Sequence, residues 1–146
     1  FTHESSGRTL RMERCGTIWA GEEQVPMAVR KSITCGDGCL RVDIEIENLS
    51  GQARTLTYGS EWNLLAFPHE IELLGPAGAA LYGGALRFEP AGAEAVWSFA
   101  LRTLSQSEGG FDIIHQGYCL CPVWPMGWSG KGTKHLSVVL KERHGR

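Results

Sequence analysis

Strict alternation of apolar and polar residues marks several segments of this sequence as β-strands. In residues 40–49, four aliphatic side chains alternate with four charged ones, which is the pattern of a strand with one buried face. Residues 95–102 and 136–140 alternate in the same way, and residues 25–33 form a weaker candidate. Apolar spacing of i, i+3, i+4, i+7 does not persist for three turns, so a helical or α/β fold is disfavoured.

Turn-forming residues separate these segments. Ser50-Gly51-Gln52 follows residues 40–49 and predicts a hairpin with residues 54–58, which are rich in Thr and Tyr. Residues 61–67 form another candidate strand that ends at Pro68, because proline lacks the N–H that a sheet requires. Residues 1–7 are polar and show no strand pattern. We therefore expect about eight to ten short strands packed as an antiparallel β-sandwich.

Length and charge limit the class of protein. A chain of 146 residues with 42% apolar residues is enough for one core, so residues 1–146 are expected to form a single domain. The net charge is -2 and the basic residues are scattered, which disfavours nucleic acid and anionic membranes as partners. No apolar run reaches the ~18 residues of a membrane span. The chain begins with Phe1 rather than Met, and we expect it to be a piece of a longer protein.

The five cysteines match neither a disulfide framework nor a common zinc spacing. Cys35 and Cys39 have the spacing of half a metal site, but Gly36-Asp37-Gly38 between them is typical of a hairpin turn. We expect reduced thiols, a cytoplasmic location, no metal and no cofactor.

Standard catalytic motifs are missing from the sequence, so any chemistry of this chain would depend on individual residues. Glu61 lies beside Trp62 in an apolar segment, where its carboxylate must face water or find hydrogen-bond donors. A structural hydrogen bond and a role facing a sugar or another domain are both open for Glu61. His115 has the chemistry of a proton shuttle, or is a hydrogen-bonded histidine at a strand end.

Tryptophans offer a second kind of candidate. Trp124 and Trp128 lie in a Pro/Gly segment that is not expected to be a central strand. They either pack in the core or present an indole to a ligand or domain interface. Trp19 and Trp97 lie in strand-like runs and are expected in the core. Residues 105–111 carry the spacing of a capping box, but no helix pattern follows, so we expect a tight loop.

Several of these segments together resemble a known family. The residues are Glu61-Trp62-Asn63-Leu64, the run Thr-Leu-Ser-Gln-Ser-Glu-Gly-Gly-Phe over 103–111, Gln116-Gly117, and the strand that ends in Pro122-Val123-Trp124. They resemble the C-terminal β-domain of family-57 glycoside hydrolases of the 4-α-glucanotransferase/α-amylase type. Residues 11–33 also resemble part of that domain, so the match spans most of the chain.

The resemblance implies a galactose-mutarotase-like sandwich, also called a supersandwich, packed against a catalytic α/β barrel that acts on α-1,4-glucans. In that family the nucleophilic Glu and the acid/base Asp lie in the barrel, and no residue of this chain matches them. The family's domain is longer than this chain, so the sandwich is expected to be incomplete. Unpaired edge strands would then favour a homodimer.

Three classes of function follow. The first is a non-catalytic accessory domain that supports the barrel and contacts an α-glucan or maltooligosaccharide through the parent enzyme. The second is a free-standing carbohydrate-binding module with a tryptophan platform, and the third is a mutarotase-like epimerase that uses His115 and Glu61. The candidates for contact with carbohydrate or another domain are Glu61, Trp62, Asn63, Ser107, Glu108, Trp124 and Trp128.

Overall fold

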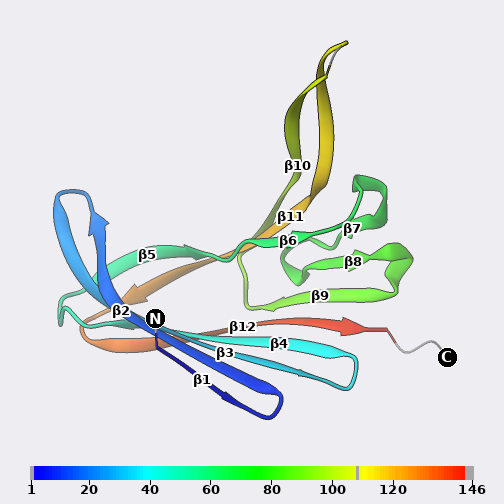
Figure 1. Cartoon of the computed structure of the whole chain (residues 1–146). Coiled ribbons are helices and arrows are strands. Elements are labelled where there is room, and N and C mark those ends of the chain that lie inside the picture. The colour runs from blue at the N-terminus through cyan, green and yellow to red at the C-terminus, as the bar shows by residue number, and fades with distance from the viewer. Residues whose placement is uncertain (1, 108, 144–146) are drawn as a thin grey trace.

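The structure is a computed structural model that describes residues 2–107 and 109–143. Its regular elements are β-strands and three short 3₁₀ helices (Figure 1). The strands are β1 Thr2–Ser6, β2 Thr9–Ala20, β3 Glu23–Gly36, β4 Cys39–Asn48, β5 Arg54–Gly59, β6 Trp62–Leu64, β7 Ile71–Leu73, β8 Ala79–Leu81, β9 Leu86–Ala91, β10 Ala95–Ser107, β11 Gly110–Trp128 and β12 Gly132–Glu142. The 3₁₀ helices are η1 Pro68–Glu70, η2 Gly75–Ala77 and η3 Tyr82–Gly84.

The strands of the described residues form two antiparallel sheets. The large sheet has eight strands in the order β1-β2-β3-β4-β12-β9-β8-β7, and the small sheet has four, with β11 between β10 and β5 and with β6 also paired to β11. Figure 1 shows β4, β12 and β9 of the large sheet below β5 and β6 of the small sheet, and β10 and β11 leaving the body together as a projecting hairpin. The all-β prediction is confirmed, and the two sheets are consistent with a β-sandwich.

The local predictions for the large sheet hold. In β4, Val42, Ile44 and Ile46 are buried while the charged residues between them are not. Gly36 pairs with Cys39 across a turn whose two central residues both have positive φ, as a two-residue hairpin with right-handed twist requires. All five cysteines are free thiols.

The predicted hairpin between residues 40–49 and 54–58 is wrong. β4 pairs with β3 and β12, whereas β5 pairs with β11 in the other sheet. The connection at Ser50-Gly51-Gln52 therefore crosses between the sheets. Asn48 is fully buried at this crossing and binds both ends of it: its side chain donates to the Gln52 carbonyl oxygen and accepts from the Ser50 backbone N–H.

The expectation that the Pro/Gly segment after Pro122 is not a central strand is also wrong, since β11 runs through it. The Pro122 carbonyl oxygen accepts from the Ser60 N–H. In an antiparallel strand the N–H and the C=O of one residue point to the same side, so the N–H that Pro122 lacks would also point to the side of Ser60. Pairing with β6 ends there at Leu120, and pairing with β5 begins at Val123. Pro125 points to the other side of β11, beyond the last residue paired with β10. Both prolines thus lie at positions where no backbone N–H has to donate to a neighbouring strand.

Two further expectations are corrected. The polar N-terminal stretch forms β1, an edge strand paired with β2. Residues 105–107 and 110–111 belong to β10 and β11 and form the end of their hairpin, not a loop. Between the sheets lies the main core, whose buried members include Ile44, Phe88 and Trp124.

Candidate functional site

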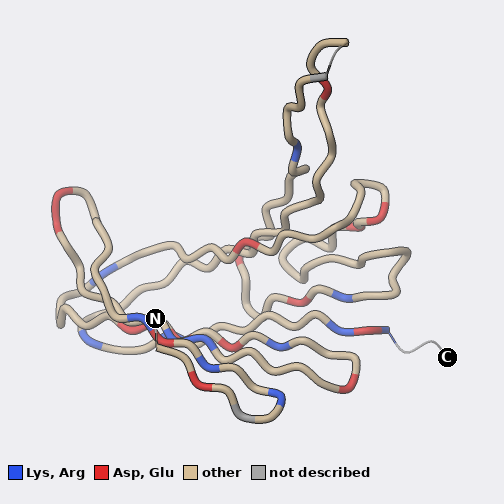
Figure 2. The backbone as a smooth tube through the Cα atoms, in the orientation of Figure 1, with Lys and Arg blue, Asp and Glu red and all other residues tan. Residues whose placement is uncertain are grey.

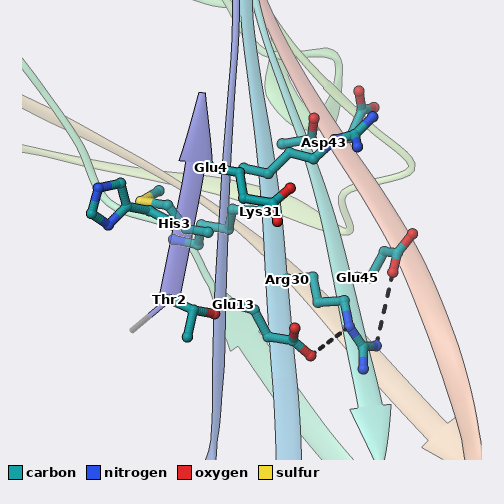
Figure 3. A pocket seen from close by; sticks show the side chains of 11 residues that line it. Thr2, His3, Glu4, Glu13, Arg30, Lys31, Asp43 and Glu45 are labelled. Atoms are coloured by element: carbon teal, nitrogen blue, oxygen red, sulfur yellow. Dashed lines mark hydrogen bonds and ion pairs between the residues drawn. The ribbon is translucent and has the colours of Figure 1, made fainter. Parts of the chain in front are cut away.

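A hollow of about 520 Å³ lies on the large sheet, over β1 to β4 (Figure 3). Arg30 occupies it and holds three carboxylates: its Nε is 2.8 Å from Glu13 Oε1, and its Nη1 is 3.0 Å from Glu47 Oε2 and 4.0 Å from Glu45 Oε2. The hydrogen bond to Glu47 is the largest cause that raises the pKa of Arg30. The guanidinium of Arg30 is thus already paired with carboxylates of the chain, and the lining of the hollow includes no Trp, Tyr or Phe on which a sugar ring would stack.

The three predicted residues at β6 point to different sides of the small sheet. Trp62 turns into the core, where its ring meets Phe88 edge to face at 5.3 Å between centroids. Asn63 and Glu61 are exposed. Burial raises the pKa of the Cys119 thiol and that of the Cys121 thiol, and the Glu61 charge adds to both shifts. Trp62 therefore packs, while Glu61 and Asn63 face solvent.

Trp124 and Trp128 are both buried. The Trp124 Nε1–H donates to the Ala91 carbonyl oxygen at 2.9 Å, and its ring tilts against Tyr58 at 6.1 Å between centroids. Core packing is thus the role that this structure shows for the two indoles.

The predicted residues at the end of the β10–β11 hairpin are only partly described. Ser107 is the last residue of β10, and Glu108 lies outside the described residues. His115 lies within β11, where its Nε2 is 2.8 Å from the Ala66 carbonyl oxygen and its ring stacks on Phe67.

Glu61 and His115 are not brought together. Glu61 precedes the residue that pairs with Leu120, so the two lie about six strand residues apart, roughly 20 Å. The pair proposed for an epimerase therefore does not form one acid/base site.

Two tryptophans lie where the sequence did not predict them. Trp19 is 68% exposed and Trp97 is 61% exposed, so the expectation that both are core residues is wrong. Trp97 pairs with Cys121 and Phe99 pairs with Cys119, and residues directly opposite in an antiparallel pair share a face. Trp97 and Phe99 therefore lie on the side of the small sheet that points away from the core.

We define this side as the outer face. By register and alternation it comprises Thr55, Thr57, Gly59, Asn63, Ala95, Trp97, Phe99, Cys119, Cys121, Val123 and Pro125. None of these strand residues is charged, but Glu61, whose charge contributes to the raised pKa of the Cys119 and Cys121 thiols, lies beside them. The large sheet, in contrast, carries acidic and basic residues along its strands (Figure 2). Cys119, Cys121 and Val123 form a second buried cluster, against which Ala95 and Leu101 pack. The outer face is thus a largely apolar surface with one neighbouring carboxylate, on a molecule whose other sheet is charged.

This chain is similar to known proteins in both sequence and fold. Residues 79–138 match the family described as alpha-amylase/4-alpha-glucanotransferase, C-terminal. A 4-alpha-glucanotransferase of Thermococcus litoralis is 30% identical over 132 residues, which cover 86% of this chain and 20% of that protein. These matches identify the chain as similar to the C-terminal domain of the alpha-amylase/4-alpha-glucanotransferase family. The crystal structure of 4-alpha-glucanotransferase from Thermococcus litoralis matches 97% of this chain and 22% of its own, with a TM-score of 0.75 at 24% identity.

The chain thus spans about a fifth of the length of the relative that it matches. The family match covers β8 to β11 and most of β12, so the projecting hairpin and the aromatic residues of the outer face lie within it. Among the described residues, no three His, Cys, Asp or Glu side chains gather as metal ligands. None of the helices in residues 2–107 and 109–143 has the length and apolar character to span a membrane.

The sequence did not predict the outer face because the alternation in residues 95–102 indicated that the side of Trp97 and Phe99 is the buried one. A signal was present in β5, where Thr55, Thr57 and Gly59 alternate with larger residues and supply an uncharged face.

Proposed function

We propose that this chain is a non-catalytic accessory domain of an enzyme that acts on α-1,4-glucans, and that it packs against the catalytic part of that enzyme through the outer face. The observation that carries the proposal is the exposure of Trp97 and Phe99 on a largely apolar sheet face. Exposed apolar surface of this kind is typical of interaction sites.

The size comparison supports the choice of occupant. Four fifths of the matched 4-alpha-glucanotransferase lies outside the region that this chain covers, so a protein of that kind has a large body available to cover the outer face. The separation of Glu61 from His115 supports a non-catalytic role. The parent is then a 4-α-glucanotransferase or an α-amylase, with α-glucan or maltooligosaccharide as its substrate.

The contribution of Trp97 can be worked out. An indole side chain has about 200 Å² of surface, and burial contributes about 25 cal/mol per Å². Covering the exposed 61% of Trp97 therefore contributes about 3 kcal/mol to docking, or about a 100-fold change in Kd.

The test uses the complete reading frame that encodes this chain. The 146-residue chain and the polypeptide that precedes it are produced separately, and their association is measured by calorimetry. Trp97→Ser is expected to weaken association about 100-fold. Trp19→Ser, which removes an equally exposed indole from the large sheet, is the matched control and is expected to have no effect.

Failure of the two parts to associate, or equal effects of the two substitutions, would refute the proposed interface. Activity is followed by chromatography of maltooligosaccharides, in which longer products indicate transfer and shorter products alone indicate hydrolysis. A reading frame without a glucan-active catalytic part would refute the accessory role.

A second candidate function rests on the same two rings. Trp97 and Phe99 lie two residues apart on one strand, so both rings face the same way, and Asn63 and Glu61 lie nearby with polar groups. Such an arrangement suits stacking on glucose rings, as in a carbohydrate-binding module. Quenching of tryptophan fluorescence by maltoheptaose, abolished by Trp97→Ser, would favour this function over docking.

The closer classification of the fold is part of the proposal. Two unequal antiparallel sheets of eight and four strands support the galactose-mutarotase-like supersandwich. Free thiols at all five cysteines support a cytoplasmic location.

A further inference from the structure

The β10–β11 hairpin extends beyond the body as an arm, which we define as residues 102–107 and 109–115 (Figure 1). A register shift between Leu101 and Arg102 separates it from the paired body of the small sheet. Beyond this shift the two strands pair only with each other. A two-stranded hairpin alone is marginally stable in water, so the arm requires a surface to lie on.

One face of the arm carries most of its apolar side chains, together with the polar residues Arg102, Gln106 and His115. Leu104 pairs with Ile113, and Phe111 lies two residues before Ile113 on the same strand, so the three side chains share a face. Leu104 is 65% exposed, and Ile113 and Phe111 are each 69% exposed. We call these three residues the arm stripe.

The stripe joins the body through His115. This residue is two positions after Ile113 and lies on the same face, and its ring stacks on Phe67 at 4.9 Å between centroids. Phe67 is itself half exposed. The stripe therefore begins at an aromatic pair on the body and continues outward along the arm.

The opposite face of the arm is different. Thr103, Ser105 and Asp112 lie there, together with Ile114, which is less exposed than the residues of the stripe. Figure 2 shows that the strands β10 and β11 carry almost no charge, with Arg102 and Asp112 as their charged residues. One face of the arm thus carries three strongly exposed apolar side chains and the other carries only Ile114, which is typical of an element that is covered on the first side and exposed to water on the other.

The arm is part of the shared fold. The solved 4-alpha-glucanotransferase matches 97% of this chain, so at most a few residues of the arm fall outside that match. In that protein the matched domain is about a fifth of the chain. The arm thus belongs to a fold that occurs, in that protein, as part of a much longer chain.

We propose that the arm stripe is a second docking site for the catalytic part of the enzyme, separate from the outer face. This inference rests on the proposed function, because it assigns the same occupant to a different surface. Aliphatic side chains dominate the stripe and suit burial against protein, since sugar rings stack on aromatic faces. The arm then contacts the catalytic part at a second place, apart from Trp97, and we call this second contact the clasp.

Hydrogen exchange measured by mass spectrometry tests the clasp. The complete polypeptide encoded by the reading frame is compared with the 146-residue chain. Amides of the arm are expected to exchange at least about tenfold more slowly in the complete polypeptide. The double variant Leu104→Ser with Ile113→Ser is expected to lose this protection. Ile114→Ser, on the opposite face, is expected to retain it.

The outcomes separate the two proposals. Protection of β10 and β11 around Trp97 without protection of the arm would overturn the clasp and leave the outer-face interface standing. Protection of neither would overturn both. Arm protection in the 146-residue chain that rises with its concentration would identify a second copy as the occupant and overturn the clasp. Exchange in β4, far from the arm, serves as the check that the double variant is folded.

Discussion

Asn48 connects the two sheets at a single buried point. It is fully buried, and its Nδ2 donates to the carbonyl oxygens of Gln52 and Gly130 at 2.8 and 3.0 Å. Its Oδ1 accepts from the backbone N–H and the hydroxyl of Ser50 at 3.0 and 2.7 Å. These bonds fix both the crossing from β4 to β5 and the turn between β11 and β12. We predict that Asn48→Ala destabilises the chain more than any surface asparagine change.

The expected loss of stability follows from these four hydrogen bonds of the Asn48 side chain. Each contributes about 1 kcal/mol net, and groups left buried without a partner cost more. Gln52 is exposed, so its carbonyl oxygen can recover a hydrogen bond to water. The free energy of unfolding should therefore fall by about 3 kcal/mol, a large fraction of the ~5–15 kcal/mol typical of a domain. Asn63→Ala, at an exposed position on β6, should change it by less than about 0.5 kcal/mol.

Urea unfolding followed by circular dichroism measures this difference. With a slope of about 2 kcal/mol per M, the midpoint should fall by about 1.5 M for Asn48→Ala. Asn48→Asp keeps the shape but turns a carboxylate toward two carbonyl oxygens, which would raise the pKa of that aspartate. Its stability should therefore be lost as pH rises through the raised pKa. An Asn48→Ala midpoint equal to that of Asn63→Ala would refute the reasoning.

Three further predictions concern packing and thiol chemistry. Gly78→Ala places a methyl carbon 1.8 Å from a backbone carbonyl oxygen of β9, at a φ of +113, and should cost about 3 kcal/mol or more in thermal unfolding. Gly75→Ala, with positive φ but open space, should cost only about 1 kcal/mol; equal effects would contradict the clash. Trp124→Phe removes the 2.9 Å hydrogen bond of the indole and should lower stability by about 1–2 kcal/mol, with an unchanged urea midpoint as the contrary result. Cys119 and Cys121 are buried and their pKa values are raised by burial, so Ellman's reagent should reach them only on unfolding; five fast thiols in the native chain would contradict this.

The sequence by itself determined the strands whose pattern is local. β3, β4 and β12 were predicted from alternation, and the turn between Cys35 and Cys39 from its Gly and Asp residues, because side-chain period and turn geometry depend on neighbouring residues alone. The family resemblance carried by residues 61–64 and 103–111 also came from the sequence and is confirmed by the family match and the similar protein.

Partners in the sheets were decided by the tertiary structure. Residues 50–52 form a plausible hairpin turn, yet β5 joins the other sheet because Asn48 holds the crossing and β11 offers the pairing edge. Pro122 is compatible with a central strand only because β11 changes partners at that residue. Neither fact is encoded within the few residues around it.

Which face of β10 became the core was likewise a matter of packing. Alternation in β10 places Trp97, Phe99 and Leu101 on one face and smaller or polar residues on the other, and it therefore predicted the wrong face as the core. On the neighbouring strand the inward residues are large, as at Leu120 and Trp124, and the outward ones are small, as at Cys119 and Cys121. Large residues pack best opposite small ones, so the space between the sheets admits only the small side chains of β10. Trp97 is therefore directed outward, onto the surface that the proposed function requires.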